Sequence, residues 1–305
     1  MKLIKPKFWK TKNFISLILY PLSAVTLLIN FLKKFSIRKT FEIKTICIGN
    51  IFIGGTGKTS LAIKLHKILS KKNLKACFVK KKYKNQIDEQ NILKNEGKLF
   101  LSSKRIDGIY QAEKNNYDIA IFDDGLQDKS INYDLSFVCF NTINWIGNGM
   151  TIPAGPLRES ISNLKNFNHI FLNGNLENLD NFKKKILNIN PKINIHIGKY
   201  IPTNINEFDP ADKYVIFSGI GNHETFVSMI KNHGLNVVKD IEFPDHYKYS
   251  DDDLNNILLE ANSLNCKIIT TEKDKTRINF SYLNKIKIIK SELQIIDEEN
   301  LIKFI

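Results

Sequence analysis

The sequence predicts an α/β protein: a P-loop-type domain with a mostly parallel sheet, a second, smaller α/β domain, and an N-terminal hydrophobic helix. Three observations lead to this prediction. From residue 41 onward, short apolar runs alternate with segments of helical periodicity, as in parallel sheets that helices cover on both faces. A glycine-rich turn follows the first of these runs, and residues 14–32 contain no charged side chain.

The chain of 305 residues is long enough for two domains that each bury a core. We expect a membrane-anchoring helix in residues 1–40 and a nucleotide-binding domain in residues 41–200. Residues 201–305 should form a smaller α/β domain that closes the active-site cleft. The boundary near residue 200 lies in a proline-containing stretch, 192–212, which favours an extended connection.

The uncharged segment 14–32 is long enough to cross a hydrocarbon core of roughly 30 Å as a helix. Lysines flank it on both sides, so positive charge does not set an orientation. Pro21 and several hydroxyl and amide side chains leave other interpretations open: a helix that lies in the interface, a cleaved signal peptide, or a buried core helix. We favour a membrane anchor, because an anionic inner-leaflet surface suits the net charge of +14.

Lysine accounts for nearly all of this charge, and no nucleic-acid-binding motif accompanies it. We therefore expect no nucleic-acid partner, and no obligate protein partner is evident. Four cysteines lie in or beside apolar runs without metal-ligand spacing, at Cys47, Cys77, Cys139 and Cys266. They are expected to be buried thiols of a reducing compartment and not a disulfide framework.

The glycine-rich turn lies between a strand predicted at residues 46–48 and a helix with apolar residues at 61, 62, 65, 68 and 69. Glycines let successive backbone N–H groups curl around a phosphate at a helix N-terminus. Lys58 can reach the β- and γ-phosphates, and the hydroxyl of Thr59 can hold Mg²⁺. The predicted nucleotide-binding residues are Gly54, Gly55, Thr56, Gly57, Lys58, Thr59 and Ser60. The strict motif has a glycine where Phe52 stands.

An apolar strand that begins near residue 117, downstream of a strand predicted at residues 75–79, ends in Asp123 and Asp124. Alone, Asp-Asp-Gly is more often a turn, but a carboxylate at a strand end beside a glycine loop can hold Mg²⁺ directly or through water. We therefore expect ATP and Mg²⁺ as cofactors. The predicted metal ligands are Thr59, Asp123, Asp124 and Glu159.

Residues 147–159 are rich in glycine and proline, which predicts a shaped loop. Arginine occurs only at positions 38, 105, 158 and 277. An arginine retained at the end of this loop indicates a need for the planar fork that grips phosphate or carboxylate, although a surface ion pair is the ordinary alternative. Arg158 is therefore a candidate active-site residue.

The remaining segments are less informative. Residues 80–104 are polar and are expected to be irregular. Strands are predicted at residues 214–217 and 266–270. Between them we expect one helix that stops at Gly234 and another that Ser250 caps.

In this order, the motifs resemble the tetraacyldisaccharide 4′-kinases of lipid A biosynthesis. The blocks are Gly-Asn-x-x-x-Gly-Gly-Thr-Gly-Lys-Thr, Asp-Glu, Asp-Asp-Gly-Leu-Gln, Gly-Asn-Gly-x-x-x-Pro-Ala-Gly-Pro-Leu-Arg-Glu, Gly-Ile-Gly-Asn, Phe-Pro-Asp-His and Thr-Glu-Lys-Asp. They span essentially the whole chain, and that family's glycine loop also lacks the first glycine. The chain departs from the family at residues 80–82, where lysines replace Ser-Arg-Gly, and at Gln90, which replaces proline.

The resemblance implies a kinase of the inner membrane, on its cytoplasmic face. It implies transfer of the γ-phosphate of ATP to the 4′-hydroxyl of a lipid disaccharide 1-phosphate, in a cleft between two domains. It further implies that Asp88 is the catalytic base and that His246 orients it, beside Lys58 and Arg158. The alternative from another class is a membrane-associated P-loop ATPase or nucleotide switch. Ile53 stands where many such ATPases have a lysine, and the guanine-reading motif Asn-Lys-x-Asp is absent from the sequence.

Overall fold

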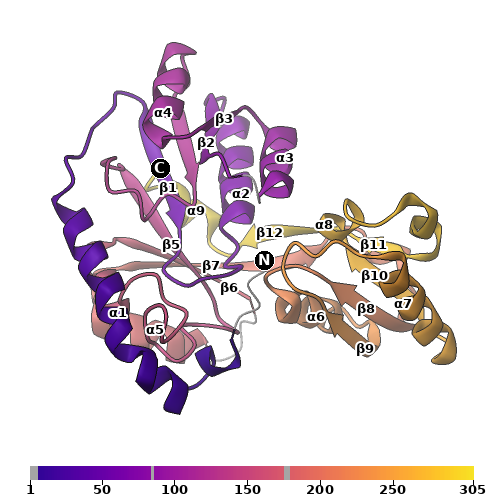
Figure 1. The fold of residues 1–305 in the computed structure, drawn as a ribbon. Helices are drawn as coiled ribbons and strands as arrows, with labels where there is room; N and C mark the ends of the chain where they lie inside the picture. Colours follow the sequence, from indigo (N-terminus) through magenta and orange to yellow (C-terminus); the bar gives the residue numbers. More distant parts are fainter. Residues whose placement is uncertain (1–5, 84–85, 175–178) are drawn as a thin grey trace. The chain divides into compact units, whose positions relative to one another are not determined.

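The computed structural model describes residues 6–83, 86–174 and 179–305, which are drawn in colour in Figure 1. They divide into two compact units. The first, here called the nucleotide unit, comprises residues 6–198 and 295–305, and the second, the small unit, comprises residues 199–294. One division point lies near the boundary that the sequence predicts at residue 200.

An eight-stranded sheet in the order β12-β7-β6-β5-β1-β4-β2-β3 forms the centre of the nucleotide unit (Figure 1). From β3 to β7, every neighbouring pair is parallel. The strands are β1 (Lys44–Gly49), β2 (Ala76–Lys81), β3 (Leu99–Ser102), β4 (Ile119–Asp123), β5 (Leu135–Asn141), β6 (His169–Asn173), β7 (Asn194–Pro202) and β12 (Ser291–Ile295).

Both faces of this sheet are buried, which explains the continuous apolar runs in its central strands. Successive side chains alternate between the faces. Cys47 and Phe122, which are partners in the β1–β4 register, belong to apolar clusters that include residues of α4 and α5. On β2, the neighbouring Phe78 instead stacks on His66 of α2. Helices therefore cover the sheet on both sides.

The helices of this unit are mostly short. They are α1 (Phe14–Leu32), α2 (Lys58–Lys71), α3 (Ile87–Glu96), α4 (Arg105–Lys114), α5 (Leu179–Ile189) and α9 (Glu298–Ile302), with 3₁₀ turns η1 (Lys7–Trp9), η2 (Lys33–Phe35) and η3 (Ile161–Asn166). The predicted loop at residues 147–159 contains no helix or named strand, in agreement with its glycine and proline content.

The small unit is built on a parallel sheet in the order β11-β10-β8-β9. Alternate residues of β8 face different helices: Tyr214 packs with α6, and Val215 packs with α7. As predicted, Gly234 follows α6 with a positive φ of 82° and Ser250 caps α7. Its elements are η4 (Ile205–Glu207), β8 (Lys213–Ser218), α6 (His223–Asn232), β9 (Asn236–Glu242), α7 (Asp251–Ser263), β10 (Lys267–Thr271), α8 (Glu272–Lys275), η5 (Phe280–Lys285) and β11 (Lys287–Ile289).

The mostly parallel sheet of the nucleotide unit and the parallel sheet of the small unit confirm the predicted fold class. One local prediction is wrong: residues 80–104 are not irregular. They hold the end of β2, then α3 and β3. The helix escaped detection because its apolar stripe is minimal. Leu93 is its one buried apolar residue, and the polar Gln90 occupies the other buried position.

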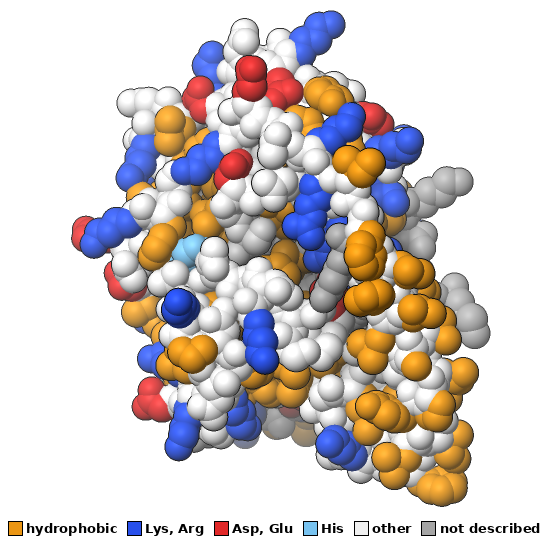
Figure 2. Space-filling model, turned by 90° about the vertical axis from the view of Figure 1, so that its left-hand side faces the viewer, with side chains coloured by type: hydrophobic (Ala, Val, Ile, Leu, Met, Phe, Trp, Pro, Cys, Tyr) orange, Lys and Arg blue, Asp and Glu red, His pale blue; other side chains and the backbone are white. Residues whose placement is uncertain are grey.

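The N-terminal helix α1 is continuous through Pro21. Among the described residues it is the helix with the length and apolarity to cross a membrane, yet only 11% of it is buried. The alternative of a buried core helix is therefore wrong. Figure 2 shows a strip of hydrophobic side chains along this helix. Among the apolar residues of α1, Ile18, Leu22 and Val25 are each more than half exposed.

Three polar side chains of α1 bind one neighbour, the loop at residues 147–159. The hydroxyls of Ser23 and Thr26 donate hydrogen bonds of 2.7 Å to the carbonyl oxygens of Thr151 and Ile152, and the amide of Asn30 donates one of 2.7 Å to the carbonyl of Arg158. Positions 23, 26 and 30 lie on one side of a helix. Helix α1 is thus fixed by its polar side, and its apolar side is exposed.

Candidate active site

The glycine loop lies between the end of β1 and the start of α2, as the sequence predicts. Gly54 and Gly57 have φ angles of 133° and 74°, a region that glycine adopts without strain. Asn50 donates hydrogen bonds to the carbonyl of Gly54 and to the hydroxyl of Thr56, and Asn173 donates to the carbonyl of Thr56. Two buried asparagines at the ends of β1 and β6 therefore fix the curvature of the loop.

Phe52 has a structural reason to replace the first glycine of the strict motif. It forms an isolated antiparallel bridge with Leu157, and its side chain is 4% exposed. On either side, the N–H of Ile53 bonds to the carbonyl of Pro156, and the N–H of Arg158 bonds to the carbonyl of Ile51. The first half of the loop is therefore paired like a strand, a conformation that favours an aromatic residue over glycine.

Asp123 ends β4 and is fully buried beside the first turn of α2. Its Oδ2 atom accepts hydrogen bonds from the hydroxyl of Thr59 at 3.2 Å and from Nζ of Lys80 at 2.5 Å. Its Oδ1 atom is buried, and no described residue donates a hydrogen bond to it. Buried carboxylate oxygens normally have partners. An orphaned oxygen next to a threonine hydroxyl therefore fits a site that binds a cation.

Asp124 faces two cations at the glycine loop. Nη1 of Arg158 donates a hydrogen bond of 2.8 Å to its Oδ1, and Nζ of Lys58 lies 3.9 Å from the same atom. Burial alone would raise the pKa of the Asp124 carboxyl. The positive charges of Lys58 and Arg158 outweigh burial and lower this pKa well below its ordinary value of 3.8.

The predicted Arg158 thus forms an ion pair with a site carboxylate and not with an ordinary surface acid. The same Nη1 atom also donates to Oε1 of Gln127, at 3.1 Å. The amide of Gln127 in turn donates to the carbonyl of Asn50 and to Oε1 of Glu159. A chain of hydrogen bonds therefore connects the loop at residues 147–159 to the glycine loop.

The four predicted metal ligands are not equivalent in the structure. Thr59 and Asp123 are in contact, whereas Asp124 is paired with arginine, and Glu159 accepts hydrogen bonds from Gln127 and Asn163. Among the described residues, no group of three His, Cys, Asp or Glu side chains has metal-site geometry. Mg²⁺ at phosphate sites typically binds one or two protein ligands and completes its shell with phosphate oxygens and water.

Asp88 is the second residue of α3, in its first turn. The next residue, Glu89, accepts a hydrogen bond of 2.9 Å from Nζ of Lys80. Burial lowers the pKa of Lys80, but the charges of Asp123 and Glu89 outweigh it and raise this pKa above its ordinary value of 10.5. The polar segment that carries the predicted base is therefore linked to the aspartate that ends β4.

His246 belongs to the small unit, where it has a positive φ of 60°. Its backbone N–H bonds to the carbonyl of Gly219, which also accepts a hydrogen bond from Arg277. Its Nε2 atom lies 3.8 Å from the Asp245 carboxylate. The Phe-Pro-Asp-His turn is thus tied to the Gly-Ile-Gly-Asn turn of the same unit.

Several site residues were not among the sequence predictions: Asn50, Lys80, Arg105, Gln127 and Asn173. Arg105 donates a hydrogen bond to the backbone carbonyl of Asp124 and pairs with Asp128, which holds Asp124 in its left-handed conformation with a φ of 60°. The scarcity of arginine, which singled out Arg158, applies equally to Arg105.

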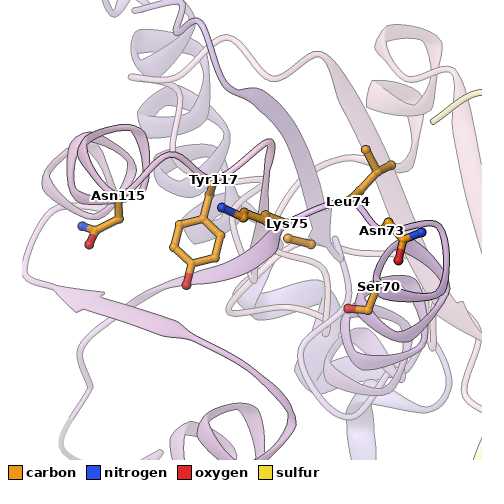
Figure 3. A pocket seen from close by; sticks show the side chains of 7 residues that line it. Ser70, Asn73, Leu74, Lys75, Asn115 and Tyr117 are labelled. Carbon is orange, nitrogen blue, oxygen red and sulfur yellow. The ribbon is translucent and has the colours of Figure 1, made fainter.

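A surface hollow in the nucleotide unit lies elsewhere, near the amino-terminal ends of β2 and β4 (Figure 3). Asp123 and Asp124 lie at the other, carboxyl-terminal end of β4. The residues that line the hollow are Ser70, Asn73, Leu74, Lys75, Ala76, Asn115 and Tyr117. None of them is a predicted site residue, so this hollow is not part of the nucleotide site.

Comparison with known proteins identifies similar chains of almost the same length. Residues 15–98 and 88–305 match the family model described as tetraacyldisaccharide-1-P 4′-kinase. The chain is 54% identical to the tetraacyldisaccharide 4′-kinase of Pelagibacter ubique (strain HTCC1062), over 99% of this chain and 96% of that protein. It is 34% identical to the protein of the same name from Rickettsia bellii (strain OSU 85-389), over 92% and 91% of the two chains.

A solved structure has the same fold. The crystal structure of LpxK from Aquifex aeolicus in complex with ATP matches with a TM-score of 0.66, over 95% of this chain and 98% of that chain, at 21% sequence identity.

Proposed function

Because the chain belongs to the tetraacyldisaccharide-1-P 4′-kinase family, as its motifs predicted, we propose that it transfers the γ-phosphate of ATP to the 4′-hydroxyl of a tetraacyldisaccharide 1-phosphate. The observation that carries this proposal is the convergence of Lys58, Asp124 and Arg158 at the start of α2, beside the glycine loop. A kinase needs such a constellation, because its catalysis rests on positioning and on stabilising phosphoryl charge.

The glycine loop binds the phosphates of ATP through backbone N–H groups and the positive end of α2. In the free protein, Asp124 is the counter-ion of Lys58 and Arg158. When ATP is bound, these two cations turn to the phosphate oxygens and stabilise the charge that spreads over the transferring group. Asp124 thereby keeps two like charges together beside the glycine loop.

Thr59 and Asp123 are the residues that would hold Mg²⁺ with ATP, because the orphaned Oδ1 atom of Asp123 fits a cation. Bound there, Mg²⁺ would neutralise charge on the β- and γ-phosphate oxygens. Asp124 and Glu159 act indirectly. Asp124 is paired with Arg158, and Glu159 accepts a hydrogen bond from Gln127, which itself accepts one from Arg158.

Asp88 is the base that takes the proton from the 4′-hydroxyl of the acceptor. The hydroxyl oxygen forms a bond to the γ-phosphorus while the bond from phosphorus to the β-phosphate oxygen breaks, and ADP leaves. His246 has the role of orienting the Asp88 carboxylate in the productive complex. A base of this kind needs to lie within about 3 Å of the hydroxyl in the productive complex.

The acceptor is a lipid, and α1 provides a means to meet it. Its polar side is bound to the loop that contains Arg158, and its apolar side is exposed. A helix held in this way lies along the membrane surface with its apolar side in the lipid. In a spanning orientation, the hydrogen bonds from its polar side chains to the loop carbonyls would be lost. Flanking lysines favour the anionic inner leaflet, and a requirement for ATP favours the cytoplasmic face.

The test is whether phosphate from ATP appears on the lipid disaccharide. Incubation with ATP, Mg²⁺ and tetraacyldisaccharide 1-phosphate in detergent micelles should yield the bisphosphorylated lipid, and ATP consumption should require the acceptor. A membrane-associated ATPase or nucleotide switch would instead hydrolyse ATP at the same rate without the lipid.

A further inference from the structure

A buried lysine lies where the nucleotide site meets α3. The side chain of Lys80, near the end of β2, is 1% exposed, and its Nζ atom lies 2.5 Å from Oδ2 of Asp123 and 2.9 Å from Oε2 of Glu89. Burial of an ammonium group is costly unless it is paired. Here carboxylates from two different elements, β4 and α3, provide the pairing.

The two contacts of Lys80 differ in what they connect. β2 and β4 are neighbours in the sheet, where Val79 pairs with Phe122, so backbone hydrogen bonds already fix Lys80 relative to Asp123. Helix α3 lies outside that ladder. The contact from Lys80 to Glu89 therefore ties the first turn of the helix to the rigid sheet.

Apolar burial contributes little to the position of helix α3. Its N-cap residue, Gln86, makes no capping hydrogen bond through its side chain, and among its residues only Gln90 and Leu93 are buried. Gln90 donates a hydrogen bond to the carbonyl of Tyr83, and at the far end Glu96 pairs with Lys67 of α2. A helix of ten residues with so little apolar burial depends on its polar contacts for its position.

We propose that Lys80 is a positioning residue that holds the first turn of α3, and with it Asp88, at the nucleotide site. Its ammonium binds Glu89 on one side and Asp123 on the other. The inference rests on the proposed function in one respect, because it takes Asp88 as the base. It also gives a role to the buried lysine at position 80.

The other contact of Lys80, to Asp123, orients the Asp123 carboxylate. Lys80 and Thr59 both bond to its Oδ2 atom, which leaves Oδ1 as the oxygen without a partner among the described residues. Lys80 thereby fixes which oxygen of Asp123 is presented to a cation and, through Glu89, where the base-bearing turn lies. Both effects come from one buried charge.

The experiment uses the full chain, three single variants and one double variant. Glu89→Ala cuts the link to α3 and leaves the buried Lys80–Asp123 pair intact, so it should fold. Lys80→Met removes both contacts. Glu96→Ala is the matched control, because it removes a salt bridge of 3.1 Å from the opposite end of the same helix. For each protein we would measure kcat and KM for ATP with the lipid acceptor, affinity for a non-hydrolysable ATP analogue with Mg²⁺, and amide hydrogen exchange in residues 86–96.

A misplaced base lowers kcat more than substrate binding, so Glu89→Ala should lose about tenfold to a hundredfold in kcat, with KM for ATP and analogue affinity within about twofold. Amide exchange in α3 should accelerate. Glu96→Ala should retain kcat. The double variant Lys80→Met/Glu89→Ala should lose no more kcat than Lys80→Met, because both act through one contact. Analogue affinity in Lys80→Met should fall, because the Asp123 carboxylate is no longer oriented.

The proposal is overturned if Glu89→Ala behaves like Glu96→Ala in both kcat and amide exchange, or if the losses in the double variant multiply. Should Lys80→Met fail to fold, Glu89→Ala alone decides. Failure of the proposed function looks different: Asp88→Ala would then keep its kcat. In that case, accelerated exchange in Glu89→Ala would still support the positioning of α3, and unchanged exchange would refute it.

Discussion

Asp124→Asn tests the electrostatic account of the glycine loop, because it removes the charge and keeps the shape. Asparagine tolerates the positive φ of 60° found at this position, so the backbone should not be strained. The amide oxygen can still accept the hydrogen bond from Arg158. What disappears is the negative charge that lies 2.8 Å from Nη1 of Arg158 and 3.9 Å from Nζ of Lys58.

The expected cost follows from these contacts. A hydrogen bond to a charged group contributes about 1.5–3 kcal/mol and a neutral one about 0.5–1.5 kcal/mol. Since the Asp124 and Arg158 side chains are only 14% and 27% exposed, solvent screens the pair little. Asp124→Asn should therefore lower the free energy of unfolding of the nucleotide unit by about 1–2 kcal/mol at neutral pH.

The pH dependence has a definite sign. The folded-state pKa of Asp124 is depressed below 3.8, so its contribution is fully present above that value and is lost as the pH falls through the folded pKa. The difference between wild type and variant should thus be constant from about pH 5 to pH 8.

Urea unfolding monitored by tryptophan fluorescence suits this test, because both tryptophans, Trp9 and Trp145, belong to the nucleotide unit. Asp180→Asn is the control: its side chain is fully exposed and 3.8 Å from Lys183, so its loss should change the free energy of unfolding far less than the loss of the Asp124 charge. If Asp124→Asn matched this control, or if the difference varied between about pH 6 and pH 8 as a histidine would cause, the electrostatic account would be wrong.

Two further predictions concern the acceptor and the membrane. Asp88→Ala should depress kcat strongly with ATP affinity almost intact, and His246→Ala should depress kcat less. The double variant should lose less kcat than the product of the two single losses. Full additivity of the losses in steady-state assays would mean that the two residues act independently. Aspartate at three exposed apolar positions of α1, namely Ile18, Leu22 and Val25, should weaken flotation with anionic vesicles. The matched control places aspartate at three exposed apolar positions of the small unit, namely Val238, Leu259 and Phe280. Equal flotation of both triple variants would place the membrane contact elsewhere.

The parts of the fold that follow from local pattern were predictable. The strand, glycine turn and helix around Lys58 adjoin in sequence, so period and composition define them. Capping of α7 by Ser250 and the stop at Gly234 are equally local. Helix α3 was missed because its burial rests on Gln90 and Leu93, which gives almost no apolar periodicity.

The connections between distant segments were not predictable in the same way. The sequence shows Lys80 as one of three consecutive lysines, and only the pairing of β2 with β4 places its ammonium against Asp123. The polar residues of α1 suggested a weaker membrane helix. In the structure, Ser23 and Asn30 bind a loop more than a hundred residues away in sequence. Tertiary partners, and not propensity, decide such contacts.

The central claim is that Lys58 serves phosphoryl transfer to a lipid acceptor, and one measurement tests it most directly. Wild type and Lys58→Ala are compared for transfer of radiolabelled γ-phosphate from ATP to tetraacyldisaccharide 1-phosphate in micelles. The account predicts acceptor-dependent transfer by the wild type and a loss in kcat of at least about a hundredfold in Lys58→Ala, as for removal of a principal electrostatic stabiliser. Near-normal lipid phosphorylation by Lys58→Ala, or ATP hydrolysis by the wild type that does not depend on the lipid, would contradict it.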